Sequence, residues 1–192
     1  PIVLIALVAG VTDTSNANWS EVLLNILLGG STGVIMVLIT EELFFRGWLW
    51  SALQRGGVSN PHVLIWTSVI FMVWHISWAT LPEEGRLPIH QIPVYLTNGL
   101  LLGLNWGAIR WLSDSVIVAS VSHAFWNVLA YSLFGYGTKI GALGIESTIV
   151  FGPEVGGLGI LLNIVFLCLV GNLVSPHSDK NKIVPQAKNL LP

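Results

Sequence analysis

Two adjacent carboxylates and an arginine interrupt a long apolar stretch of the chain. Residues 22–40 carry no charge, and Glu41, Glu42 and Arg46 then follow within six positions. A charge at bilayer depth costs about 2.5–3.5 kcal/mol on insertion scales, so buried charges usually face a cavity and a partner. The spacing of four lets Glu42 pair with Arg46 along a helix, while Glu41 points about 100° away. The cluster either holds helices together or activates water, with Glu41 as the general base and Glu42 kept ionised by Arg46.

Three further polar side chains lie inside apolar segments. His75 ends the run Phe-Met-Val-Trp-His at positions 71–75, and His123 and Asn127 are four residues apart. That spacing places His123 and Asn127 on one face of a helix. Two histidines and a glutamate match the ligand set of catalytic zinc sites, which leave one position open for water. Asparagine is an uncommon zinc ligand, so we expect Asn127 to donate to a developing oxyanion.

The composition indicates a membrane protein that must position these groups on helices. Hydrophobic residues make up 53% of the 192 residues and charged residues only 9%, and the mean hydropathy is +0.74. Soluble domains contain about 25% charged residues. The net charge of −2 gives no indication of a nucleic-acid partner, and the single cysteine, Cys168, excludes an internal disulfide. The expected partners are membrane lipid and a peptide or protein substrate.

The predicted fold is all-α, a polytopic membrane helical bundle with about five or six transmembrane spans. We place the spans at residues 31–54, 61–81, 92–112, 115–134 and 155–174, with a bend or break at Gly29-Gly30. Residues 135–153 could be a loop or a re-entrant segment. Asn98 and Asn105 lie seven apart on one helix face and are expected to bind a neighbouring helix.

Alternating spans place the polar groups at a similar depth. At 1.5 Å per residue, Glu41, His75, His123 and Asn127 lie about 9–16 Å from the same side of the membrane. They could therefore converge on one buried cavity.

We divide the chain into an N-terminal helical segment whose beginning is expected to be absent (1–30), a catalytic core (31–134), a loop or re-entrant segment plus last helix (135–175) and a soluble tail (176–192).

The three motifs resemble those of one protein family. Glu-Glu-x-x-x-Arg at 41–46, Phe-x-x-x-His at 71–75 and His-x-x-x-Asn at 123–127 are similar to the signature motifs of the CPBP intramembrane proteases. This family includes type II CAAX prenyl endopeptidases and bacteriocin-processing and self-immunity proteins. The resemblance covers residues 31–130 and implies that Glu41 activates water, Arg46 supports Glu42, His75 and His123 bind water or a divalent metal such as zinc, and Asn127 stabilises the oxyanion.

The resemblance implies a multi-pass membrane endopeptidase, expected in the cell membrane, that cleaves a membrane-associated peptide or protein, with prenylated proteins as one candidate class. A non-catalytic immunity or scaffold protein of the same fold is the main alternative. An ion-coupled carrier is a third hypothesis, because mid-membrane acids and histidines also form proton relays. The sequence shows no inverted repeat, which counts against a carrier.

Overall fold

The computed structural model describes residues 1–80, 87–137 and 139–180, with side chains up to residue 172, and it is mostly helical. The part of residues 176–192 beyond Lys180, expected to be a soluble tail, lies outside the described residues. The elements in chain order are α1 (Ile2–Val8), α2 (Trp19–Val37), the π-helix η1 (Leu38–Leu49), α3 (Trp50–Arg55), α4 (Asn60–Thr80), α5 (Ile92–Ser113), α6 (Val116–Phe134), β1 (Gly135–Tyr136), β2 (Lys139–Ile140), α7 (Thr148–Phe151) and α8 (Gly157–Lys180).

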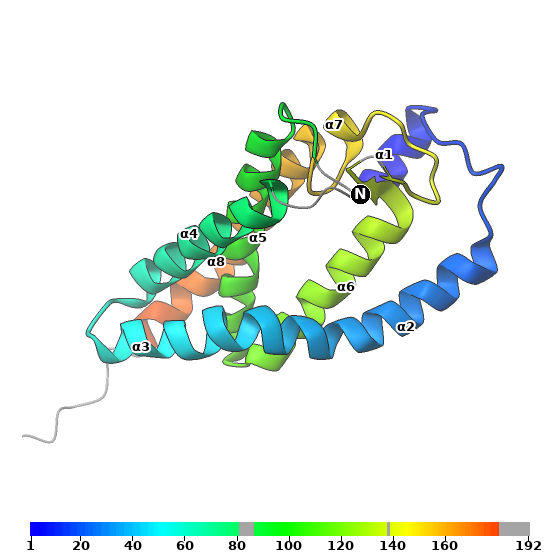
Figure 1. Cartoon of the computed structure of the whole chain (residues 1–192). Coiled ribbons are helices and arrows are strands. Elements are labelled where there is room, and N and C mark those ends of the chain that lie inside the picture. The colour runs from blue at the N-terminus through cyan, green and yellow to red at the C-terminus, as the bar shows by residue number, and fades with distance from the viewer. Residues whose placement is uncertain (81–86, 138, 181–192) are drawn as a thin grey trace, which may run out of the picture.

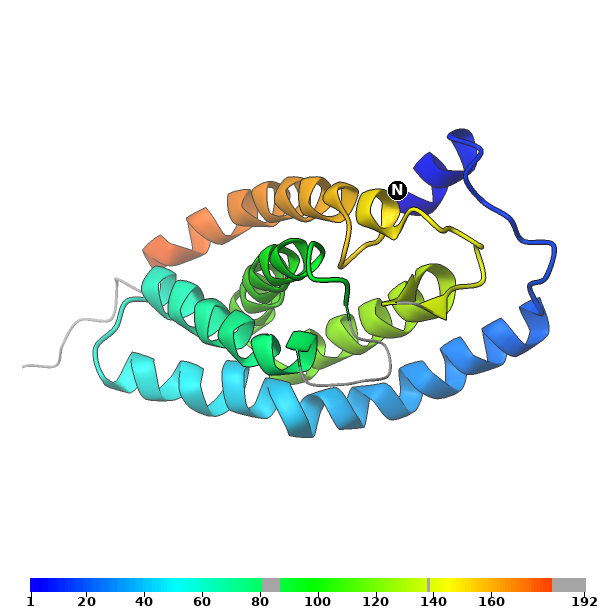
Figure 2. The same ribbon diagram turned by 45° about the horizontal axis from the view of Figure 1, so that its top comes forward.

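Helix α5 is the centre of the bundle. It packs against α4, α6 and α8, and α6 also packs along α2. The elements α2, η1 and α3 form one continuous helical run along one side of the molecule (Figure 1). At the other end of α6, the β1–β2 hairpin, α7 and α1 lie together near the N-terminus (Figure 2). The interior of the bundle is enclosed by α4, α5, α6 and the π-helix η1. The polar motifs lie in this interior.

The break that the sequence allowed at Gly29-Gly30 is wrong, because α2 runs without interruption from Trp19 to Val37. The two glycines instead allow α6 to approach closely. A Cβ at Gly29 would lie 3.0 Å from Val128, and one at Gly30 would lie 3.1 Å from the ring of Phe125. The span therefore starts earlier than residue 31, and α2 runs across the boundary that we placed after residue 30.

The change in helix geometry comes further along the run, at the polar motif. The π-helix η1 covers 12 residues and contains Glu41, Glu42 and Arg46. Its hydrogen bonds join residues five apart, and π-helical turns are rare and occur frequently at functional sites. The unusual local geometry therefore coincides with the residues that the sequence singles out.

Asparagines hold α5 against α8, as predicted. The side-chain NH2 of Asn98 donates to the Gly156 carbonyl at 3.2 Å, and Asn98 Oδ1 accepts from the Asn163 side chain at 3.0 Å. The Asn105 amide donates to the Asn163 carbonyl at 3.3 Å. All three asparagines are buried, so these hydrogen bonds satisfy groups that an apolar interior would otherwise leave unpaired.

The segment after α6, left open as a loop or a re-entrant segment, forms a short antiparallel hairpin, a turn and helix α7. Leu143 and Ile145 in the turn pack with Phe134 and with Ile2 and Ala6 of α1 in one buried cluster. This segment therefore covers the end of the bundle. Helix α8 starts after it and continues to Lys180, past the end we predicted for the last span.

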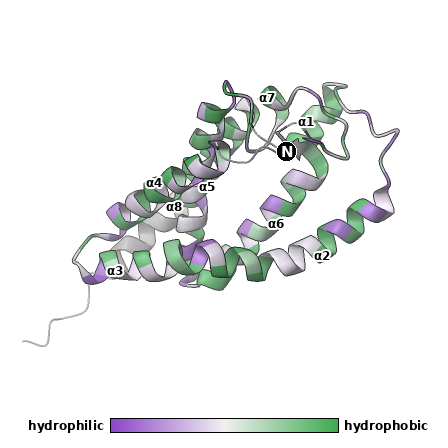
Figure 3. Cartoon of the chain, viewed as in Figure 1, coloured by the Kyte–Doolittle hydropathy of each residue, from purple (hydrophilic) through white to green (hydrophobic). Residues whose placement is uncertain are grey.

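The outer surface is apolar, as a membrane protein requires. Among the described residues, three helical stretches are long and apolar enough to cross a membrane: Trp19–Arg55, Asn60–Thr80 and Val116–Phe134. The apolar part of α8, Gly157–Asn172, is shorter. Side chains such as Leu27 and Ile35 of α2 are exposed, and hydrophobic residues cover much of the helix surfaces in Figure 3. Lipid can accept such a surface, whereas water would not.

Candidate active site

A fully buried ion pair forms the base of the site. Glu42 and Arg46 are both 0% exposed, and the guanidinium Nη1 donates to Glu42 Oε1 at 2.9 Å. The other terminal nitrogen, Nη2, donates to the Gly103 carbonyl of α5 at 3.1 Å. The guanidinium also lies 4.4 Å from the centre of the Phe71 ring. Arg46 therefore compensates the Glu42 charge and joins η1 to α5, which agrees with the supporting role expected for it.

The second interaction of Glu42 orients His123. The Nδ1–H group of His123 donates to Glu42 Oε1 at 2.8 Å, and the imidazole stacks on Trp106 with 3.6 Å between ring centres. When the ring is neutral, this hydrogen bond selects the tautomer with the proton on Nδ1, so Nε2 is unprotonated and can accept a hydrogen bond. Nε2 lies 3.8 Å from Glu41 Oε2. This distance is too long for a direct hydrogen bond and suits two groups that share a water molecule.

His75 is held in the same tautomer by its own helix. Its Nδ1–H donates to the Phe71 carbonyl one turn earlier at 2.8 Å, and the two rings lie 4.2 Å apart. Since a carbonyl only accepts, Nδ1 must carry the proton and Nε2 is left as an acceptor. Both site histidines therefore present an unprotonated Nε2, although the groups that bind their Nδ1 atoms differ.

The two histidines and Asn127 meet at one small cavity. Its volume is about 20 Å³, and a cavity needs about 10–15 Å³ to hold a water molecule. The cavity therefore has room for one water. Glu41 is not among its lining residues, and its Oε2 lies 3.8 Å from Nε2 of His123, which is one of them. The residues that line the cavity are His75, Tyr95, Gly99, Leu102, Trp106, His123, Asn127, Tyr131 and Glu154.

Glu154 is a lining residue that our reading of the sequence missed. It lies between α7 and α8 and is 6% exposed, and its two oxygens accept from Trp126 Nε1 and Tyr131 Oη, both at 3.0 Å. Burial raises the pKa of Glu154 to about 7. A signal was present, because Glu154 is the only Asp, Glu, Lys or Arg between Glu146 and Asp179.

The described residues do not form a recognisable metal site. No three His, Cys, Asp or Glu side chains within the described ranges are grouped so that they could hold a metal ion. Glu41 and Glu42 approach the site from η1 on the side of His123. The metal-binding role of His75 and His123 therefore stays a prediction, and the chemistry below uses only the side chains of the chain.

Comparison with known families agrees with the three motifs. The profile of the family described as type II CAAX prenyl endopeptidase Rce1-like matches residues 19–129, more than half of the chain. The chain belongs to this family. The match includes all six residues of our predicted site, from Glu41 to Asn127. No curated protein and no solved structure matched the chain. Membership of the Rce1-like family indicates an intramembrane protease, and the three candidate spans indicate an integral membrane protein.

Proposed function

We propose that this Rce1-like protein is an intramembrane endopeptidase in which Glu41 activates one water molecule beside His75 and His123. The observation that supports this most strongly is the geometry of His123. Glu42 binds its Nδ1, so its Nε2 is presented to Glu41 Oε2 at a distance of 3.8 Å. The adjoining cavity has room for one water molecule.

Hydrolysis then needs only side chains of the chain and the water. The water lies beside His75 and His123, donates one hydrogen bond to a histidine Nε2 and the other to the Glu41 carboxylate, and these two bonds position its oxygen. Glu41 takes a proton as the water oxygen bonds to the carbonyl carbon of the scissile peptide. Asn127 donates to the resulting oxyanion. When the carbon–nitrogen bond breaks, Glu41 returns the proton to the leaving amine, and a carboxylic acid and an amine are the products.

The apolar surroundings define where the substrate comes from. The site lies within helices whose outer faces suit lipid, so the substrate is a peptide or protein associated with the membrane, with prenylated proteins as one class. We infer that the three candidate spans, the α2–η1–α3 run, α4 and α6, are joined by α5 and α8 as further spans of the cell membrane. Helix α5 is the span whose faces are largely covered by the other helices.

The decisive experiment compares Glu41→Gln with a matched control. Asp114→Asn makes the same carboxylate-to-amide change at an exposed turn, where φ is +50° and asparagine is as well tolerated as aspartate. Membrane proteomes of cells with each variant are compared for cleaved fragments. We expect fragments with the unchanged protein and with Asp114→Asn, and none with Glu41→Gln. Fragments that persist with Glu41→Gln would exclude Glu41 as the base.

A second measurement addresses the two histidines. Activity is measured after treatment with a strong chelator, with metal removal verified by elemental analysis, and full activity would leave His75 and His123 binding the water directly. Loss of activity that zinc restores would instead make His75 and His123 metal ligands. If Glu41→Gln leaves the cellular function intact, the chain acts as an immunity or scaffold protein and our proposal is wrong.

A further inference from the structure

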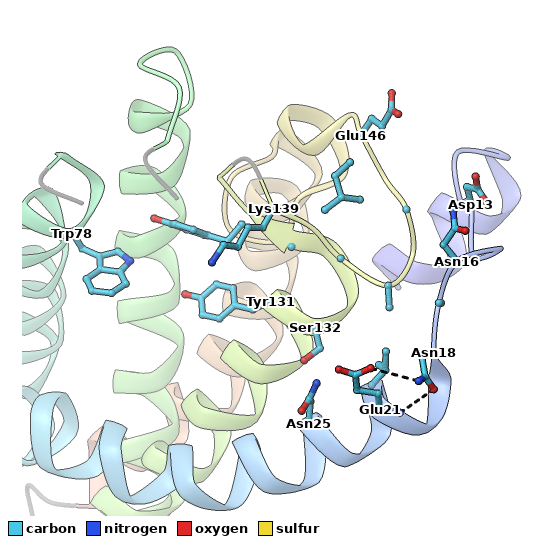
Figure 4. Close-up of a pocket in the computed structure, with 18 residues that line it drawn as sticks. Asp13, Asn16, Asn18, Glu21, Asn25, Trp78, Tyr131, Ser132, Lys139 and Glu146 are labelled. Atoms are coloured by element: carbon cyan, nitrogen blue, oxygen red, sulfur yellow. Dashed lines mark hydrogen bonds between the residues drawn. The ribbon is translucent and has the colours of Figure 1, made fainter. Parts of the chain in front are cut away.

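A second, much larger cavity lies at the end of the bundle that the hairpin covers. Its volume is about 910 Å³, within the range of about 300–1,000 Å³ that is typical of ligand pockets. The walls come from the loop before α2, the first turns of α2, the end of α6 and the hairpin region (Figure 4). Many of the lining side chains are polar or charged, in contrast to the lipid-facing surface.

One residue, Tyr131, lines both this cavity and the small cavity at the histidines. Its hydroxyl donates to Glu154, which also lines the small cavity. Its ring packs edge-on against Tyr136 of the hairpin, 5.5 Å between centres. The small cavity holds about one water, so a peptide can reach His75 and His123 only if part of this wall moves. Tyr131 is the part of the wall that has the large cavity on its other side.

The charges of the large cavity favour a cationic ligand. Its lining contains three acidic residues, Asp13, Glu21 and Glu146, and one basic residue, Lys139. Asp13 already accepts from the Ser15 hydroxyl at 2.7 Å. Figure 4 shows the Glu21 side chain directed into the cavity beside Asn18. The Asn18 amide is 3.5 Å from Glu21, at the long limit of a hydrogen bond, so Glu21 can bind an additional cation.

We propose that this polar cavity binds a basic segment of the peptide substrate and that Tyr131 is the movable partition between it and the catalytic water. The identification of the ligand as part of a substrate rests on the endopeptidase function proposed above. The cavity is large enough for several residues of an extended chain, and it lies at the end of the spans, where lysine and arginine side chains can remain hydrated. The adjoining part of the peptide then reaches His75 and His123 once Tyr131 swings aside.

Binding can be tested without activity, on the Glu41→Gln background in a neutral detergent. The probes are fluorescent synthetic peptides of equal length that carry lysine, glutamine or glutamate at the same positions. We expect the lysine peptide to bind most tightly and its affinity to fall with added salt. Glu21→Gln should weaken the lysine peptide about threefold, the scale of one partly exposed charge pair. Asn25→Asp, which adds a charge to the same wall, should strengthen it by a similar factor.

The opposite signs of the two variants exclude a general loss of folding as the cause. Equal affinity for the three peptides, or no response to Glu21→Gln and Asn25→Asp, would overturn the assignment of the ligand. Because this binding assay does not use turnover, its failure is distinct from a failure of the protease proposal, which the cleavage experiment measures.

The role of Tyr131 as a partition can be tested by measuring how fast a thiol reagent reaches the small cavity. Gly99 lines that cavity, and a Cβ there would meet no atom within 4 Å, so Gly99→Cys introduces a thiol without a clash. In a Cys168→Ser background, a charged thiol reagent added from water should label this cysteine slowly. Adding Tyr131→Ala should accelerate labelling by about tenfold, which corresponds to a free energy of local opening that is lower by about 1.4 kcal/mol. An unchanged labelling rate would show that access runs elsewhere and would refute the role of Tyr131.

Discussion

Replacing Arg46 by methionine tests whether the buried ion pair holds the site together. Glu42 and Arg46 are both completely buried, and methionine keeps the apolar stem of the side chain but removes the charged guanidinium. Glu42 would then be an uncompensated charge in the bundle interior, for which a loss of about 3–5 kcal/mol is expected. The additional change Glu42→Gln should recover most of this loss, because glutamine is neutral and its oxygen can still accept from His123 Nδ1–H.

The free energy of unfolding can be measured by detergent denaturation in mixed micelles, with the fluorescence of the nine tryptophans as the signal. Asp114→Asn is the control, because Asp114 pairs with Arg110 at the same spacing of four and the Asp114 side chain is 95% exposed. A surface pair of this kind contributes about 0–1 kcal/mol. If Arg46→Met costs no more than Asp114→Asn, or if Glu42→Gln adds a further loss to it, the buried charge is not what stabilises this region.

Three further changes probe the oxyanion donor, the cover of the bundle and Glu154. Asn127→Ala should lower kcat about 10²–10³-fold with little change in KM, measured on any cleaved substrate, because the amide acts on the transition state. Gly144→Ala should destabilise the protein in thermal unfolding more than Gly10→Ala, although both glycines have positive φ, because a Cβ at Gly144 would collide with the Asp13 backbone oxygen while one at Gly10 meets nothing within 4 Å. The carboxyl of Glu154 keeps its proton in the folded state up to a pKa of about 7, against an ordinary value of 4.5, so stability should fall as pH rises through this window, by at most about 1.4 kcal/mol per pH unit. Glu154→Gln should remove that slope in unfolding measured between pH 4.5 and 7, and an unchanged slope would assign it to other groups.

The sequence predicted the convergence at the site well because each polar group was isolated in an apolar segment. His123 contacts both Glu41 and Glu42 across α6 and η1, and His75 and Asn127 line the same cavity as His123. Helical rise and span order were sufficient to place these groups at one depth. Their chemical roles remain predictions, since geometry alone does not measure turnover.

Other features depended on packing that a single sequence does not display. Gly29-Gly30 predicts a bend on local grounds, but the glycines serve the contact with Phe125 and Val128, which are about a hundred residues away. Glu154 lies in a glycine-rich connection where a carboxylate is ordinary, and only the folded chain brings it to Tyr131. The short hairpin after α6 has no alternating pattern long enough to predict a strand.

The geometry of η1 limits which changes in chain length the protein can tolerate. A helix whose hydrogen bonds join residues five apart can lose one residue and close as an ordinary α-helix without interrupting the run. A deletion between Leu38 and Thr40 would therefore leave hydropathy and helix content nearly unchanged. Because a π turn holds about one residue more than an α turn, this closure leaves the orientation of Glu41 and Glu42 relative to α2 nearly unchanged, and His123 keeps both of its carboxylate neighbours. A one-residue gap at this place in a relative is thus compatible with catalysis, whereas the same gap in an ordinary α-helix would rotate the two glutamates by about 100°.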